Sequence, residues 1–253
     1  MNNTNLLSLL NDITETTSFD IFIPTLQREV TFKPLTTKQQ KGFFTCIKDN
    51  IIYNTRFVML THNIIKENCK EPEILNLLTV LDKEVILLAL RKNALGSYIK
   101  TSGVNISIDS CLEYSKTITL PANEEIIYNN IKIELQPALM VDQYNMEEEL
   151  RGTLRDEKLT LTAIASDIVL NSLCKIIKNM WVNKNGEFIN INYSEYNYKD
   201  RITLLENLPY SFLEKIQEYS TKITIIQNKL KEVAFDSATT VRVSIDTDFF
   251  LTG

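Results

Sequence analysis

The hydrophobic residues of this chain change their spacing along the sequence, and this change constrains the fold more than any other feature. Val104, Ile106 and Ile108 alternate with small polar residues, which is the period of a β-strand. Between residues 82 and 96 the apolar side chains recur at helical intervals instead. Because the two periods occupy separate blocks, we expect an α+β fold that is rich in helices.

A hairpin is predicted at the N-terminal side. Apolar residues alternate over 19–23, and the alternation resumes over 30–32 after a polar turn. Pro34 ends this pattern. A capping-box spacing then predicts the start of a helix, in either of two frames: Thr36 with Gln39, or Thr37 with Gln40.

The helix predicted with the most signals runs from residue 82 to 96. Asp82 suits its N-cap because a carboxylate can accept the free amides of the first turn. Arg91 and Lys92 lie near its negative end, and Gly96 ends it. Another helix is predicted over 55–68.

The remaining elements are predicted as follows. Residues 103–137 form a small antiparallel β insertion, with a turn at Asn129-Asn130 and an end at Pro137. A long helix covers about 159–182, and a last helix begins at Pro209. The chain closes with a strand over 241–245.

We expect one α+β protein spanning residues 1–253, because the pattern shows no repeat, low-complexity tract or linker. Its three parts are an N-terminal hairpin with helices over 1–100, the antiparallel β insertion over 101–140, and a helical region ending in a strand over 141–253.

Composition bears on several function classes. The net charge is −5, from 27 basic and 32 acidic side chains, which argues against nucleic-acid binding through bulk charge. The single histidine, His62, excludes two-His metal sites and multi-His catalysis. Six glycines, where an average chain of this length has roughly 18, leave little for a phosphate-binding loop. With no catalytic motif present, we predict no catalytic residue, no cofactor and no metal.

Targeting signals are not evident. The first 15 residues lack the basic start and unbroken apolar stretch of a signal peptide. The longest apolar run, 85–90, is far shorter than the roughly 20 residues of a membrane span. We therefore expect no membrane partner, and a cytosolic setting with four reduced cysteines: Cys46, Cys69, Cys111 and Cys174. A zinc site using His62 and Cys69 would need two distant ligands, so an ordinary boundary histidine is favoured.

The densest run of carboxylates is Glu147, Glu148 and Glu149, and a stretch of mixed charge that includes Asp156 and Glu157 follows it. A catalytic pair within 147–157 is one hypothesis. A solvated helix face with ion pairs between residues four apart is the favoured one.

Four aromatic residues are candidates for protein contact. Tyr193 and Tyr196 lie among asparagines, and tyrosine offers both apolar area and a hydrogen bond; packing at the edge of the core is the competing interpretation. Phe249 and Phe250 are adjacent, and each is worth about 2 kcal/mol when buried. They either dock back onto the domain or fill a partner's pocket.

Several stretches along the chain form a set of structural rather than chemical motifs, consisting of turns, caps and a closing strand. In order they are Ile23-Pro24, Val30-Thr31-Phe32-Lys33-Pro34, Lys38-Gln39-Gln40-Lys41, the helix from Leu81-Asp82-Lys83-Glu84 through Leu90-Arg91 to Leu95-Gly96, and Asp248-Phe249-Phe250. Together these stretches resemble the baseplate hub assembly proteins of T4-like contractile-tailed bacteriophages.

The resemblance implies a late-expressed, non-enzymatic phage protein that helps to build the central hub of the tail baseplate in the host cytoplasm. Its implied partners are other hub or tail proteins. One departure concerns metal, because some relatives carry paired cysteines in the middle sheet, whereas Cys111 stands alone here. The alternatives are a permanent component of the virion baseplate and, in another class, an enzyme using carboxylates near 147–157. Whether the protein stays in the particle, and its oligomeric state, are left open.

Overall fold

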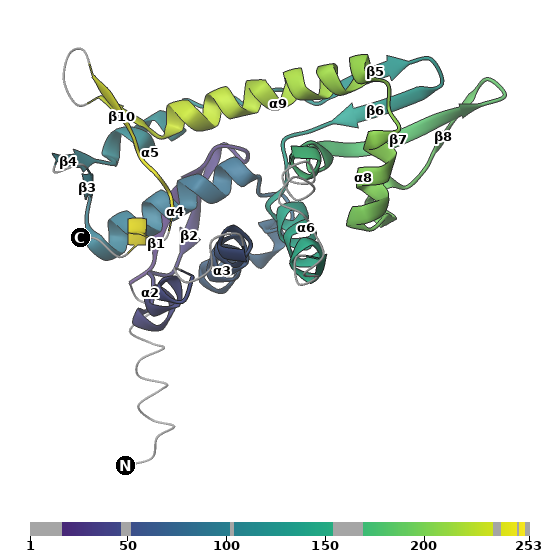
Figure 1. Cartoon of the computed structure of the whole chain (residues 1–253). Coiled ribbons are helices and arrows are strands. Elements are labelled where there is room, and N and C mark those ends of the chain that lie inside the picture. Colours follow the sequence, from purple (N-terminus) through teal and green to yellow (C-terminus); the bar gives the residue numbers. More distant parts are fainter. Residues whose placement is uncertain are drawn as a thin grey trace. The chain divides into compact units, whose positions relative to one another are not determined.

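A computed structural model describes residues 17–46, 52–101, 104–153, 169–234, 239–246 and 248–250. It confirms an α+β protein with an N-terminal hairpin and small antiparallel sheets (Figure 1). The chain forms two compact units. Unit 1 comprises residues 1–119 and 228–253, and unit 2 comprises 120–227. These boundaries differ from the predicted ones at 100 and 140, because the C-terminal segment returns to unit 1 and makes it discontinuous.

Unit 1 begins with the predicted hairpin. Strands β1 (Phe19–Ile23) and β2 (Arg28–Phe32) pair antiparallel, with Ile21 opposite Val30. The apolar residues on one face of the hairpin are buried, and α4 packs against β1. The capping box that precedes α2 (Thr37–Phe44) uses the first predicted frame, with Thr36 as N-cap and Gln39 at the third helical position.

Two longer helices follow α2 in unit 1. They are α3 (Ile52–Asn68) and α4 (Val80–Leu95), separated by the 3-10 turn η1 (Pro72–Ile74). The predicted N-cap of α4 is wrong by three residues: Thr79 is the cap, and Asp82 is the third helical residue of a capping box. Gly96 ends α4 at φ +85°, a backbone conformation that glycine adopts without strain.

The stretch predicted as one β insertion is divided between the two units. In unit 1 it contributes β4 (Val104–Ser107) and then helix α5 (Asp109–Ser115). The partner of β4 is β3 (Tyr98–Thr101), which precedes the predicted sheet. Residues 109–115 are predicted within the sheet, but they form α5 instead. At the first residue of this helix, the Asp109 side chain accepts hydrogen bonds from the hydroxyls of Ser97 and Ser107. The C-terminal part of unit 1 contains β9 (Glu232–Ala234), β10 (Thr240–Arg242) and the 3-10 turn η3 (Asp248–Phe250). The predicted closing strand is therefore present in shorter form.

Unit 2 is built on a four-stranded antiparallel sheet of order β5-β6-β7-β8. Its strands are β5 (Glu124–Tyr128), β6 (Ile131–Leu135), β7 (Ile177–Lys184) and β8 (Glu187–Asn190). The turn between β5 and β6 has Asn129 at φ +50°, as the Asn-Asn pair predicted. The turn between β7 and β8 has Asn185 at φ +57° and Gly186 at φ +92°, which is the type I′ pattern.

The predicted helix over 159–182 is wrong at its C-terminal end. Residues 169–174 are helical, but 177–184 form strand β7, and 154–168 lie outside the described residues. The register between β6 and β7 shifts, so that Leu135 pairs with Ile177 while Glu134 pairs with Asn179. This bulge places Ile177 and Met180, three residues apart, on the buried side. Because of the bulge, buried residues of this strand have the three-residue spacing that is typical of a helix.

Helices complete unit 2. They are α6 (Met140–Thr153), the 3-10 turn η2 (Tyr193–Glu195), α8 (Tyr198–Glu206) and α9 (Tyr210–Leu230), whose last three residues are assigned to unit 1. The last predicted helix, beginning at Pro209, is confirmed as α9, and its side chains Phe212, Ile216 and Tyr219 are buried. These side chains join one core with the sheet residues Ile126, Ile133, Leu135, Ile177 and Met180.

Candidate protein-contact site

Phe249 and Phe250 are buried inside unit 1, with 2% and 0% of their area exposed. The Phe250 ring stacks on Phe43 of α2, with centroids 4.0 Å apart and planes 3° from parallel. The Phe249 ring contacts the Phe250 ring edge-to-face, with the ring centroids 5.1 Å apart. Of the two alternatives for this pair, the structure shows the docked one. To fill a pocket on a partner, both rings would have to leave this buried position in unit 1.

Polar contacts hold the backbone of the same segment. Arg91 of α4, fully buried, donates from Nε to the carbonyl of Phe249 at 3.2 Å. The same guanidinium donates to the carbonyls of Gly96 and Tyr98 and lies 5.6 Å from the Phe249 ring centroid. Gln40 donates to the carbonyl of Phe250 at 3.3 Å. Arg91, predicted as a charge near the helix end, thus joins α4, β3 and η3.

The two candidate tyrosines of unit 2 differ in exposure. Tyr193 is 1% exposed, and burial raises the pKa of its hydroxyl. Arg201 lies over its ring at 5.1 Å and donates to the carbonyls of Ser194 and Tyr196. For Tyr193, then, core packing is the arrangement observed. Tyr196 is 38% exposed and is the one candidate of the four with a surface to offer.

In the described part of the carboxylate run, two side chains are bound by segments outside their own helix. Glu147 binds Lys175 at 2.9 Å, and both side chains are largely buried, at 13% and 11% exposure. Glu149 accepts a hydrogen bond from the backbone N–H of Tyr198 at the start of α8. Glu148 is exposed, and Glu157 lies outside the described residues. Glu147 and Glu149 therefore connect α6 to two other segments of unit 2.

These positions predict different effects for three similar substitutions. Glu147→Gln leaves a mostly buried lysine without its ion pair, and we expect it to lower the free energy of unfolding by about 2 kcal/mol. Glu148→Gln is the matched control and is expected to change it by less than about 0.5 kcal/mol. Urea denaturation followed by the fluorescence of Trp181, the only tryptophan, measures both. Equal stability of the two variants would contradict a structural role for Glu147.

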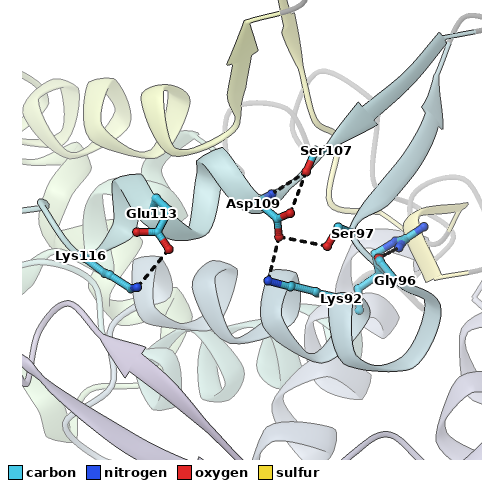
Figure 2. A network of polar contacts seen from close by, with 8 residues as sticks. Lys92, Gly96, Ser97, Ser107, Asp109, Glu113 and Lys116 are labelled. Carbon is cyan, nitrogen blue, oxygen red and sulfur yellow. Dashed lines mark hydrogen bonds and ion pairs between the residues drawn. The ribbon is translucent and has the colours of Figure 1, made fainter.

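A second polar network joins the end of α4 to the start of α5 (Figure 2). Asp109 binds Lys92 at 2.8 Å and accepts from the hydroxyls of Ser97 and Ser107, each at 3.0 Å. These donors, with the Lys92 bond foremost, hold the pKa of Asp109 below its ordinary value. Ser107 also accepts from the Asp109 backbone N–H at 3.2 Å. These bonds connect the end of α4 to the start of α5.

The thiols and the histidine do not gather into a metal site in the described part of the chain. All four cysteines are free and buried, and burial raises the pKa of Cys111 and of Cys174 to about 11 each. No group of three or more His, Cys, Asp or Glu side chains suited to a metal is found among the described residues. His62 is half-buried on α3 and Cys69 is buried just after that helix.

The sequence analysis missed an exposed apolar edge on unit 2. All four residues of β8 are exposed, among them Phe188 at 36% and Ile189 at 48%. Val182, opposite Ile189 on β7, is 39% exposed. We call Val182 together with residues 187–190 the β8 edge. The sequence predicts the turn over 183–186 and a short strand with Phe188, Ile189 and Ile191, and both are confirmed. The exposure of this strand was missed because its partner strand was predicted as part of the helix over 159–182.

Comparisons with protein-family models, curated proteins and solved structures found no match for this chain. Within the described residues, no helix combines the length and apolarity needed to span a membrane. The fold is that of a mixed α+β protein, and the apolar side chains that it leaves exposed on unit 2 include Tyr196 and those of the β8 edge.

Proposed function

We propose that this protein assists assembly of the baseplate hub of a contractile-tailed phage through protein contacts, without catalysis. The proposal starts from the resemblance of the stretches between residues 23 and 250 to that family of assembly proteins. Its partners would be hub or tail subunits, and its setting the host cytoplasm during assembly. The virion tail baseplate is its location under the alternative in which it stays in the particle.

One observation carries the proposal furthest: the stretches that bear the resemblance meet within unit 1. The hairpin turn reaches α4, since the Thr25 backbone N–H donates to Asp82 at 3.0 Å. Near the other end of α4, Arg91 binds the carbonyl of Phe249. Gln40 of α2 binds the carbonyl of Phe250. Separate turns and caps that resemble one family are thus the parts of one packed unit, which supports treating them as a single shared scaffold.

The exposed side chains support a role in binding. Tyr196 and the β8 edge offer apolar area at the surface of unit 2. Exposed apolar side chains next to unpaired strand edges are typical of surfaces that receive another chain. Glu147 and Glu149, from the carboxylate hypothesis, are already bound by Lys175 and the Tyr198 backbone. No observation of the described residues favours the enzyme alternative over the binding role.

The test is mass spectrometry of purified virions and of infected-cell lysates of the parent phage. We expect peptides of this chain in the lysate, co-purifying with hub subunits through a tag on this chain, and not in the finished particle. Peptides of a major tail subunit, present in both samples, are the control for detection. A few copies in each virion would support the permanent-component alternative. Expression without any hub or tail partner would overturn the proposal.

A further inference from the structure

Strand β8 has one side available for pairing. In the part of the chain that the structure describes, β8 pairs only with β7. Lys184 and Glu187 flank a two-residue type I′ turn and therefore exchange the first pair of hydrogen bonds. Because bonded and non-bonded pairs alternate in an antiparallel ladder, the N–H and C=O groups of Phe188 and Asn190 point away from β7. The inward hydrogen bond of Ile191 to Met180 at 3.0 Å agrees with this alternation.

An apolar row runs across the sheet and ends at this edge. The registers place Tyr128, Ile131, Val182 and Ile189 opposite one another on successive strands, hence on one face. Tyr128 and Ile131 pack against the core of unit 2. Val182 and Ile189 continue the row outward and are 39% and 48% exposed. The row ends in apolar side chains that no described segment covers.

The opposite edge of the sheet is different. Strand β5 begins with Glu124 and Glu125, and Glu124 is bound by Lys222 of α9 at 2.5 Å. Charges at an edge, and an adjacent helix, are devices that prevent pairing with another chain. Strand β8 has no lysine, proline or bulge, and its one charge, Glu187, lies beside the turn. The two edges therefore differ in their readiness to accept a strand.

We propose that β8 pairs antiparallel with β8 of a second copy of this chain, with Ile189 on the two-fold axis. In this register Phe188 and Asn190 of each copy exchange hydrogen bonds, so every outward backbone group of the two residues is used. The apolar row becomes continuous through both sheets, from Tyr128 of one copy to Tyr128 of the other. Glu187 lies opposite Ile191 of the second copy, and no like charges face each other across the pair. The inference does not rest on the proposed function.

The expected dimer is weak. A four-residue edge covers much less than the roughly 1,600 Å² of a standard interface. We therefore expect dissociation in the micromolar range and an equilibrium that depends on protein concentration. We expect such a dimer to dissociate and re-form rapidly, unlike an obligate dimer, whose interface is large and apolar.

Cysteine substitution tests the register directly in the full chain. Ile189→Cys places two thiols in a non-hydrogen-bonded pair on the axis, with Cα atoms about 4.5 Å apart, within reach of a disulfide. Phe188→Cys is the matched control, because its Cα lies diagonal to that of its copy, about 7–8 Å away. Since the four native thiols are free and buried, we expect copper-phenanthroline to crosslink Ile189→Cys at least tenfold faster. Equal rates for the two variants would overturn the register.

Sedimentation velocity from about 1 to 200 μM, with native circular dichroism checked, tests the pairing itself. Ile189→Lys places two positive charges together on the axis, and we expect at least tenfold weaker dimerisation. Ile127→Lys is the control, because Ile127 is 56% exposed on the other edge strand, and we expect unchanged dimerisation. A native chain that stays monomeric throughout, or equal weakening by both variants, would overturn the proposal. Crosslinking of Ile189→Cys to a different protein in infected cells, with no self-crosslink, would assign the edge to that protein instead.

Discussion

Phe250→Ala is expected to destabilise unit 1 by about 3–5 kcal/mol, the usual cost of truncating a buried phenylalanine. The ring is fully buried, stacked on Phe43 and in edge contact with Phe249. Its removal leaves a cavity beside Phe43 and loosens the segment whose carbonyl groups are bound by Arg91 and Gln40. We expect the loss to reach α4, because Arg91 lies on that helix.

Amide hydrogen exchange of α4 peptides is the suitable measurement, since the only tryptophan, Trp181, lies in unit 2. If exchange follows opening of the unit, the slowest α4 amides should exchange about two orders of magnitude faster or more in Phe250→Ala. Phe44→Ala is the control, because Phe44 is adjacent to Phe43 in the chain but 54% exposed. Its effect should stay below about 1 kcal/mol. Similar exchange in the two variants would mean that Phe250 is not docked in solution.

Asp82→Ala should have an effect of similar size, for a polar reason. The fully buried carboxylate accepts four hydrogen bonds: from the backbone N–H and hydroxyl of Thr25, at 3.0 and 2.5 Å, and from the backbone N–H and hydroxyl of Thr79, at 2.7 and 2.8 Å. Removing it breaks the capping box of α4 and leaves the backbone N–H of the buried Thr79 unsatisfied in the interior. The exposed residue Thr25 loses the acceptor of its backbone N–H and of its hydroxyl as well. We expect a loss of about 3–5 kcal/mol.

The matched control for Asp82 is another Asp–Thr hydrogen bond at the surface. Asp20 accepts from the Thr31 hydroxyl at 2.6 Å, and the pair is exposed on the β1–β2 hairpin. Asp20→Ala should cost less than about 1 kcal/mol, because water replaces the lost acceptor. Amide exchange of α4 separates the two cases. Asp82→Ala with exchange as slow as that of Asp20→Ala would show that the buried network contributes little to the stability of α4.

Local chemistry was sufficient to predict much of unit 1. The alternation around Ile21 and Val30 predicted the hairpin, and Thr36 with Gln39 predicted the start of α2. Gly96 correctly predicted the end of α4. Such signals act over a few residues, so they can be read without knowing what the rest of the chain does. The capping error at Asp82 is of the same kind, since Thr79 and Asp82 are the two halves of one capping box.

Long-range pairing decided what the sequence analysis missed. The spacing of Ile177 and Met180 fits a helix, and only pairing with β6, with its bulge between Glu134 and Leu135, makes it a strand. Once β7 is a strand, its partner β8 becomes a sheet edge, and the exposed surface at Ile189 follows from that pairing.

By itself the sequence determined the α+β class, the N-terminal hairpin and the ends of several helices, because turns and caps depend on neighbouring residues. The tertiary structure decided which aromatic residues reach the surface. Phe250 is buried because Phe43, more than two hundred residues earlier, supplies the face on which it stacks. Tyr196 is exposed while Tyr193, three residues away, lies in the core. Burial depends on contacts between distant segments, and it is the fold that brings those segments together.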